Sequence, residues 1–445
     1  MTRLLRIFLV LAFVGGGPLS ESKAIQETLH DDIADLRSPN TGTRENAAKA
    51  LAQTARPEAI EPLTEAMRDP EVKVRRAVAK ALRAQQNPDA IDGLLMALRD
   101  EEKDVRSEGL AGLVEIYVSP DQRRPITRFL SVFQEKGPRP AAPPRPTMPI
   151  AERVVLGLEA RLQDDEPSLR RQAAYALGVL RAEQAVDSLG TSLADPSKDV
   201  RTEAVEALTL IGGEEAGAQL VAGLSEPSRQ IQGQLVEALG RIRYRPAAEE
   251  LLVVYDGWQG KELGDKALTA LALIGAPQSR GVFLQNMTSV SSQRRRWAVE
   301  GMGRLRDENL RTSLTKDFLR EPDASVQSAY CFALSLIGRP EFIDRLALNL
   351  SDPMLREQSM SYLVELGGPF MAELVLYLSD PVAEVRKGMA YVLEQIGDPN
   401  AIPYLRPLLS DPDPQVADWA NRAIAHLERV GAAVEPASEP TRPTT

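Results

Sequence analysis

The chain has 445 residues, a formal net charge of −10 and 43% hydrophobic but only 5% aromatic residues. This acidic balance argues against a function built on many phosphate contacts, so we expect no nucleic-acid partner. Its single cysteine, Cys331, excludes an intramolecular disulfide and a cysteine-based metal cage.

Residues 1–24 resemble an export signal. Arg3 and Arg6 precede an apolar run at residues 7–14, and Ser22-Lys23-Ala24 offers small residues for cleavage after Ala24. The apolar run is shorter than the roughly 20 residues that a spanning helix needs. We therefore expect a bacterial protein exported to the periplasm or cell envelope, with membrane contact only through an uncleaved signal. The alternatives are an uncleaved anchor and a cytosolic amphipathic leader, which leaves the chain cytoplasmic.

Apolar residues with helical spacing return about every 31 residues from Thr43 to Val416. In one unit they are Val200, Ala204, Ala207, Leu208 and Ile211, at offsets that share one face of a helix. Such a period predicts a stack of units that contact mainly their neighbours. Twelve first helices are expected, beginning near Thr43, Val74, Val105, Leu169, Val200, Ile231, Leu263, Arg294, Val326, Leu355, Val385 and Val416.

Each first helix is followed by a short break, a second amphipathic helix and, in most units, an acid-proline boundary such as Asp380-Pro381. Arginine follows the register position in eight units. We interpret these arginines as structural partners of the boundary acids, because both recur with the same period; a basic ladder for an anionic polymer is the alternative. They are Arg44, Arg75, Arg106, Arg170, Arg201, Arg295, Arg356 and Arg386.

One step between first helices is about twice the usual length. It contains the proline-rich stretch 137–149, which we interpret as an exposed insertion in one continuous superhelix; a hinge between repeats 25–136 and 150–430 is the alternative. The last unit has only a first helix, which should cap the array. Residues 431–445 lack apolar content and are expected to be a disordered tail.

The recurring phrase resembles the HEAT repeat of the phycobilisome-lyase-like class. Its best copy is Asp380-Pro381, Val385-Arg386, Ile396-Gly397 and Ala401-Ile402-Pro403. The resemblance implies an all-α solenoid, an armadillo/HEAT-like superhelix of about eleven helix pairs plus a C-terminal capping helix. It also implies first helices on the convex side and second helices lining the concave side.

Proteins of this class bind other proteins or peptide segments, so the resemblance implies a scaffold or adaptor that works through its concave face. The alternative is an accessory enzyme of the same repeat family, similar to bilin lyases or to the metal-dependent deoxyhypusine hydroxylase. That hydroxylase holds iron with repeated His-Glu pairs, whereas His30 is followed by Asp31 and His426 by Leu427. We therefore expect no catalysis, no metal and no cofactor. The repeat slot of Cys331 predicts a buried packing residue.

Two departures from the repeat suggest where a partner could bind. Trp297 and Trp419 occupy a slot that is polar in most units, so Trp297 is a candidate anchor or a side chain that covers a gap. The turns that contain Arg243 and Arg306 are rich in arginine. These arginines either are cations favoured near helix C-termini or form a basic rim that receives an acidic segment of a partner. We predict an aromatic-basic groove over residues 241–311, formed by Arg241, Arg243, Tyr244, Arg245, Tyr255, Trp258, Trp297, Arg304 and Arg306. The sequence leaves the oligomeric state open.

Overall fold

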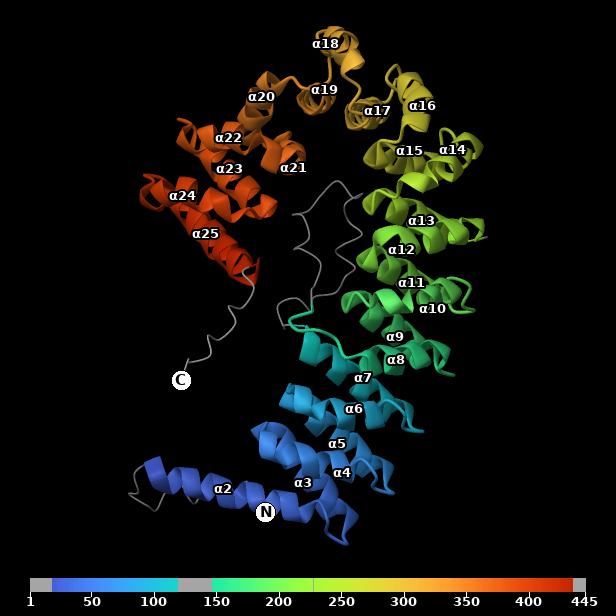
Figure 1. Ribbon diagram of the computed structural model, residues 1–445, viewed down its shortest axis with the longest axis vertical. Coiled ribbons are helices and arrows are strands. Elements are labelled where there is room, and N and C mark those ends of the chain that lie inside the picture. Colours follow the sequence, from blue (N-terminus) through green and yellow to red (C-terminus); the bar gives the residue numbers. More distant parts are fainter. Residues whose placement is uncertain (1–17, 119–145, 227, 435–445) are drawn as a thin grey trace, which may run out of the picture. The chain divides into compact units, whose positions relative to one another are not determined.

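The computed structural model describes residues 18–118, 146–226 and 228–434. All regular elements in these ranges are helices, and the chain divides into two compact units, residues 1–226 (unit 1) and residues 227–445 (unit 2). Long first helices alternate with short second helices, eleven pairs in all, before a final single helix (Figure 1). The predicted all-α solenoid of about eleven pairs with a C-terminal cap is confirmed.

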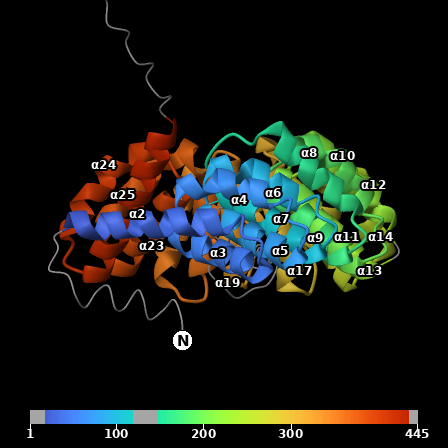
Figure 2. The same ribbon diagram turned by 90° about the horizontal axis from the view of Figure 1, so that it is seen from below.

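The described part of unit 1 begins with an additional helix, α2 (Pro18–Asp35), that packs on the first repeat. Its short helices form one layer over the long helices (Figure 2). The long helices are α3 (Thr41–Thr54), α5 (Val72–Gln85), α7 (Lys103–Tyr117), α9 (Pro167–Val179) and α11 (Lys198–Ile211). The short helices are α4 (Ile60–Ala66), α6 (Ile91–Ala97), α8 (Glu152–Ala160), α10 (Val186–Ser192) and α12 (Gly213–Ala222).

Unit 2 continues the same alternation to the capping helix α25 (Pro414–Val434). The other long helices are α13 (Arg229–Arg241), α15 (Glu262–Ile274), α17 (Ser292–Arg304), α19 (Ala324–Leu336), α21 (Arg356–Leu366) and α23 (Ala383–Ile396). The short helices are α14 (Ala248–Gly257), α16 (Arg280–Asn286), α18 (Arg311–Phe318), α20 (Ile343–Leu348), α22 (Met371–Leu374) and α24 (Ile402–Leu405). Helix α25 extends into the expected tail as far as Val434, and residues 435–445 lie outside the described ranges.

The arginine ladder is structural. The Arg75 guanidinium donates to Asp100 at the next repeat boundary at 2.6 Å and, through Nη1, to the Asp69 carbonyl at 3.0 Å. Each such pair joins consecutive repeats and leaves the arginine little exposed. The same bridge is formed by Arg44–Asp69, Arg106–Asp164, Arg170–Asp195, Arg201–Glu226, Arg295–Glu321 and Arg386–Asp411. Arg356 differs, because its Nε donates to the Leu350 carbonyl.

The repeats on either side of the double-length step pack directly on each other. Helix α7 contacts α9, and Arg106 forms an ion pair with the buried Asp164 at 2.8 Å. The Tyr117 carbonyl, at the end of α7, accepts from the Thr147 amide at 2.8 Å. Helices α7 and α9 are therefore neighbours in one stack. Most of the proline-rich stretch 137–149, and most of the predicted signal 1–24, lie outside the described residues.

A glycine recurs every two repeats in part of the array. Gly178, Gly240 and Gly303 occupy the same place in alternate long helices, and each faces an alanine of the next one. A Cβ on Gly303 would lie 2.5 Å from the Ala333 Cα, and a Cβ on Gly178 would lie 2.5 Å from the Ala207 Cα. These glycines allow backbone-to-backbone contact between α9 and α11, between α13 and α15, and between α17 and α19.

The assignment of first helices to the convex side is wrong for unit 2. Its long helices lie on the inner side of the curved stack and its short helices on the outer side (Figure 1). Side chains of α17 reach α21, two repeats further on, as in the Arg304–Glu365 ion pair. Such contacts require the long helices to converge. The acid-proline boundary therefore introduces the inner helix of each pair, and the concave surface of unit 2 is formed by first helices.

Cys331 lies in the interior of α19, with no exposed surface. Burial in apolar surroundings raises the pKa of its thiol to about 12, so it stays protonated and unreactive at neutral pH. The predicted packing role of this cysteine is confirmed.

A partly buried carboxylate in unit 1 should make stability depend on pH. Desolvation and the neighbouring Glu206 raise the pKa of Glu203 on α11 to about 7, against an ordinary value of 4.5. Between these values the folded chain keeps a proton that the unfolded chain has lost, so stability falls as the pH rises. We expect Glu203→Gln to remove a loss on the order of 2 kcal/mol.

The measurement is urea unfolding followed by helical circular dichroism at about pH 5 and about pH 8. Glu203→Gln should resist urea better than the parent only at the higher pH. The exposed Glu215, on α12, supplies the control variant Glu215→Gln, which should behave as the parent at both. Equal pH dependence in the parent and Glu203→Gln would show that Glu203 titrates normally.

Candidate functional site

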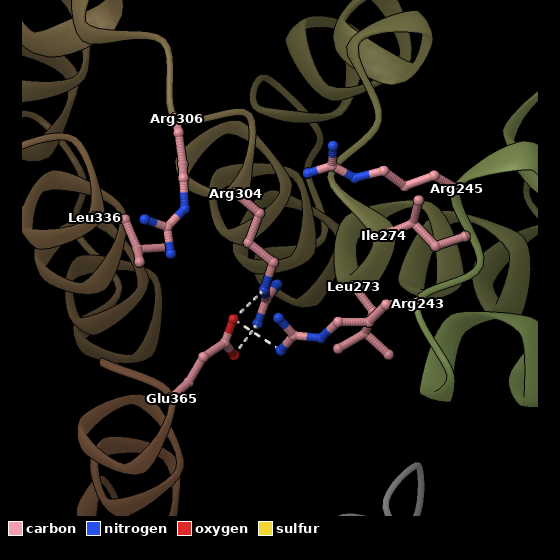
Figure 3. A pocket seen from close by; sticks show the side chains of 8 residues that line it. All are labelled: Arg243, Arg245, Leu273, Ile274, Arg304, Arg306, Leu336 and Glu365. Atoms are coloured by element: carbon pink, nitrogen blue, oxygen red, sulfur yellow. Dashed lines mark hydrogen bonds and ion pairs between the residues drawn. The ribbon is translucent and has the colours of Figure 1, made fainter. Parts of the chain in front are cut away.

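The candidate site is a pocket of about 200 Å³ in unit 2, where the C-terminal ends of inner helices converge. Side chains from α15, α17, α19 and α21 line it together with the turn that follows α13 (Figure 3). Its lining residues are Arg243, Arg245, Leu273, Ile274, Arg304, Arg306, Leu336 and Glu365. The pocket thus contains four guanidinium groups and one carboxylate.

Arg304 and Glu365 form the floor of the pocket. Arg304 Nε and Nη2 donate to the two Glu365 oxygens, both at 2.9 Å, and Nη1 donates to the Ala272 carbonyl at 3.1 Å. Arg243 Nη2 also reaches Glu365, at 2.8 Å. Burial alone would raise the pKa of Glu365, but the hydrogen bonds and charges of Arg304 and Arg243 outweigh it and hold that pKa below its ordinary value. Glu365 is therefore ionised at neutral pH.

An aromatic layer fixes the floor from below. The Arg304 guanidinium lies 5.0 Å from the Phe332 ring centroid, and the Phe332 ring stacks on Tyr362 at 4.5 Å. The Tyr362 hydroxyl donates to Glu300 at 2.5 Å, and Glu300 also lies within 3.5 Å of Arg304. These contacts join α17, α19 and α21, so the carboxylate-guanidinium floor is rigid.

Arg243 and Arg306 stand at a turn position that has a positive φ in most repeats, where glycine fills it in some repeats and other residues fill it in others. Their φ angles are +53° and +54°, whereas Gly275 and Gly338 occupy the equivalent turns with φ of +61° and +88°. A side chain in this left-handed region costs roughly 1–2 kcal/mol. Ala55, Gln86 and Arg181 hold the same turn in unit 1 with φ of +46°, +47° and +52°, so the left-handed turn belongs to the repeat. In the repeats of Arg243 and Arg306 it places an arginine at the rim of the pocket.

Replacing Arg306 by glycine should raise the free energy of unfolding of unit 2 by up to about 1 kcal/mol, because it relieves the strained φ. The three tryptophans, Trp258, Trp297 and Trp419, all lie in unit 2, so urea unfolding followed by tryptophan fluorescence measures this unit. Arg306→Ala removes the same charge but keeps a Cβ, so it should bring no gain. A marked loss of stability in Arg306→Gly would show that the arginine is held for stability.

The rim also has arginines that are available to a ligand. Arg245 and Arg306 are exposed, and within the described residues neither side chain has a hydrogen bond, an ion pair or a ring contact (Figure 3). Arg243 is half-exposed and shares Glu365 with Arg304. Including Glu300 beneath the floor, four guanidinium groups face two carboxylates, which leaves the site with excess positive charge.

The structure separates the aromatic residues of the predicted groove from the basic ones. Trp258 lies under Arg229, 4.5 Å from the ring centroid to the guanidinium carbon, at the N-terminal end of α13. Arg243 follows the opposite end of this 13-residue helix, which is about 20 Å long. Tyr255 is buried and accepts from Asn286 at 2.7 Å, so it is a packing residue.

Three other predicted residues lie outside the pocket lining. Trp297 is half-buried on α17, seven residues before Arg304 and therefore about 10 Å further along the helix. Arg241 is the last residue of α13, and Tyr244 lies in the turn between Arg243 and Arg245. The structure thus brings together Arg243, Arg245, Arg304 and Arg306, and adds a residue that the sequence analysis did not single out, Glu365.

The sequence contains a signal that could have identified Glu365. One slot of the first helix, ten residues past the register position, holds Leu210, Leu273 and Leu336 in alternate units. The two units between them carry Arg241 and Arg304 there, and the unit after Leu336 carries Glu365. Arg304 and Glu365 carry opposite charges at a slot that is apolar in other units, and they lie two repeats apart. This pattern indicates an ion pair that passes over the long helix between them.

The described part of the chain contains no group of three or more His, Cys, Asp or Glu residues arranged to hold a metal ion. None of the described helices is long and apolar enough to cross a membrane.

Comparison with known proteins identifies the repeat. The HEAT-repeat model matches residues 33–113, 155–240 and 371–436, just over half of the chain. No curated protein matches the sequence significantly.

Three solved structures that match the chain have low sequence identity and TM-scores below 0.5. Yeast importin-β (Kap95p) is 13% identical with a TM-score of 0.48, covering 96% of this chain and 65% of its own. The CpcE–CpcF complex of the Nostoc phycocyanin lyase is 20% identical with a TM-score of 0.35, covering 66% and 99%. Human deoxyhypusine hydroxylase is 22% identical with a TM-score of 0.26, covering 57% and 99%. The family-model match, together with the alternating helix pairs, shows that the chain belongs to the HEAT-repeat family.

Proposed function

We propose that this protein is a non-catalytic scaffold that holds a segment of another protein against the inner surface of unit 2. HEAT-repeat arrays typically present extended concave surfaces to partners. The observation that carries the proposal is the pocket of four arginines on this surface, two of them without a partner among the described residues. A scaffold gains affinity from several weak contacts at once, and such a pocket supplies one of them.

We further propose that the protein works in the periplasm or cell envelope of a bacterium. The support for this location is the leader sequence, with Arg3 and Arg6 ahead of the apolar run 7–14 and a cleavage motif at Ser22-Lys23-Ala24. Fractionation of cells that produce the full chain tests the compartment. Recovery in the cytoplasm with residues 1–24 still attached would contradict export.

The scaffold proposal is tested by site-specific photo-crosslinking in cells. A photoreactive amino acid at Leu336, in the pocket lining, should form covalent adducts with a partner protein that mass spectrometry then identifies. The matched control is the same amino acid at Leu348, which is 54% exposed on the outer helix α20. Adducts from Leu336 and not from Leu348 are expected. A lack of protein adducts at Leu336 would argue against a scaffold that acts through this surface.

A further inference from the structure

The pocket already shows which chemical group it recognises. Glu365 places its carboxylate between Arg304 and Arg243, with two parallel hydrogen bonds from Arg304 at 2.9 Å. Paired N–H donors match the geometry of a carboxylate and make charge-assisted bonds of about twice the strength of neutral ones. Two of the four arginines, Arg304 and Arg243, are thus occupied by the Glu365 carboxylate.

The other two arginines of the pocket, Arg245 and Arg306, are available to a ligand. Figure 3 shows the guanidinium groups of Arg245 and Arg306 on either side of Arg304, with no interaction drawn to either of them. The pocket volume of about 200 Å³ is large enough to admit an acidic side chain beside Glu365.

The turns after the long helices set which side chains reach the rim. Arg306 has φ of +54°, a conformation that Ala55, Gln86 and Arg181 share in unit 1 and that Gly338 adopts in the next repeat. The Arg306 side chain has no hydrogen bond, ion pair or ring contact among the described residues. Gly275, by contrast, is required by space, because a Cβ there would lie 2.6 Å from the Arg304 Cβ and 2.9 Å from its carbonyl oxygen. The turns therefore keep arginine at the rim while they allow close packing at the floor.

We propose that the pocket is a carboxylate receptor, in which an acidic side chain of a partner segment binds Arg245 and Arg306 as Glu365 binds Arg304 and Arg243. This inference deepens the proposed function and rests on it for the source of the ligand. The affinity of one such site is modest, and it decreases with salt because the rim is open to solvent.

The test uses the purified full chain and a fluorescent polyglutamate peptide, with a polyglutamine peptide of equal length as control. Fluorescence anisotropy at low ionic strength should show binding of polyglutamate only. Arg245→Gln and Arg306→Gly should each weaken it about fivefold to tenfold, as expected for loss of one charge-assisted contact. Arg320→Gln, which removes an exposed arginine just beyond α18 and outside the pocket, should leave it unchanged.

Three results would overturn the inference: equal binding of the two peptides, unchanged affinity in both pocket variants, or an equal loss in Arg320→Gln. Succinate and inorganic phosphate serve as competitors at equal charge. Displacement by phosphate far below the succinate concentration would also overturn it, because the site would then be a phosphate site. Because Arg306→Gly relieves backbone strain, its loss of binding cannot be assigned to misfolding.

The inference and the proposed function fail in different ways. If the crosslinked partner is captured equally well when Arg245→Gln and Arg306→Gly are combined, the scaffold stands and the carboxylate receptor does not. If polyglutamate binds at the pocket but no partner is ever crosslinked from Leu336, the receptor chemistry stands and the scaffold function does not.

Discussion

Replacing Glu365 by leucine should lower the free energy of unfolding of unit 2 by about 2–4 kcal/mol. The substitution removes both hydrogen-bonded oxygens from the guanidinium of Arg304, which is only 9% exposed, and leaves it the longer contact with Glu300 at 3.5 Å. Desolvation of the buried guanidinium is then only partly offset by an ion pair. Urea unfolding of the full chain, followed by tryptophan fluorescence, measures the change.

The chain itself supplies the control for this prediction. Neighbouring repeats hold leucine at the same slot, at Leu273 and Leu336, so the double variant Arg304→Leu with Glu365→Leu continues an existing pattern. We expect the double variant to recover most of the lost stability, since apolar replacements of buried ion pairs are often neutral or better. A single Glu365→Leu variant as stable as the parent would mean that the floor of the pocket is hydrated and open.

Replacing Gly303 by alanine should destabilise unit 2 by about 2–3 kcal/mol. The added Cβ would lie 2.5 Å from the Ala333 Cα and 2.7 Å from its Cβ, far inside normal contact distance. Backbone cannot move aside as a flexible side chain can, so α17 and α19 would have to separate. The same fluorescence-detected unfolding measures the loss.

Gly281 provides the matched control, because it lies in the outer helix α16 and a Cβ there meets nothing within 4 Å. Gly281→Ala should therefore stabilise the protein by up to about 1 kcal/mol, as expected for alanine in an exposed helix. Destabilisation of equal size at both positions would show that the Gly303 contact is not the cause. Separation of α17 from α19 should also weaken polyglutamate binding, because Arg304 is the last residue of α17 and Arg306 lies in the turn after it.

The core and the order of the helices could be predicted from the sequence in detail. The apolar offsets place residues such as Val200, Ala204 and Leu208 on one face, and all three are buried. The boundary arginines could be assigned as structural for a similar reason, because an acid follows most of them at a separation of 25 or 26 residues. Both are short-range properties, set within one repeat or between adjacent ones, and these have a period that sequence reveals.

The candidate site could be predicted only in part. The sequence predicts that the basic turns gather in one place, and Arg243, Arg245, Arg304 and Arg306 do line one pocket. The sequence also predicts Trp258 beside them, because it lies between them along the chain, but an antiparallel helix pair carries it to the other end of α13. Proximity in sequence does not give proximity in space when each helix reverses the direction of the chain.

The sequence by itself determined the repeat, the helix pairs, the buried face and the role of Cys331, because all of these follow from helical spacing and its recurrence. Only the tertiary structure decided that first helices form the inner surface of unit 2. It also decided that Glu365 meets Arg304 two repeats earlier and Arg243 four repeats earlier. Such contacts depend on curvature, which accumulates from small rotations at each interface, including the Gly–Ala contacts between α13 and α15 and between α17 and α19. The rotation between adjacent repeats is set by how their side chains pack, so it cannot be read from the length of the repeat in the sequence.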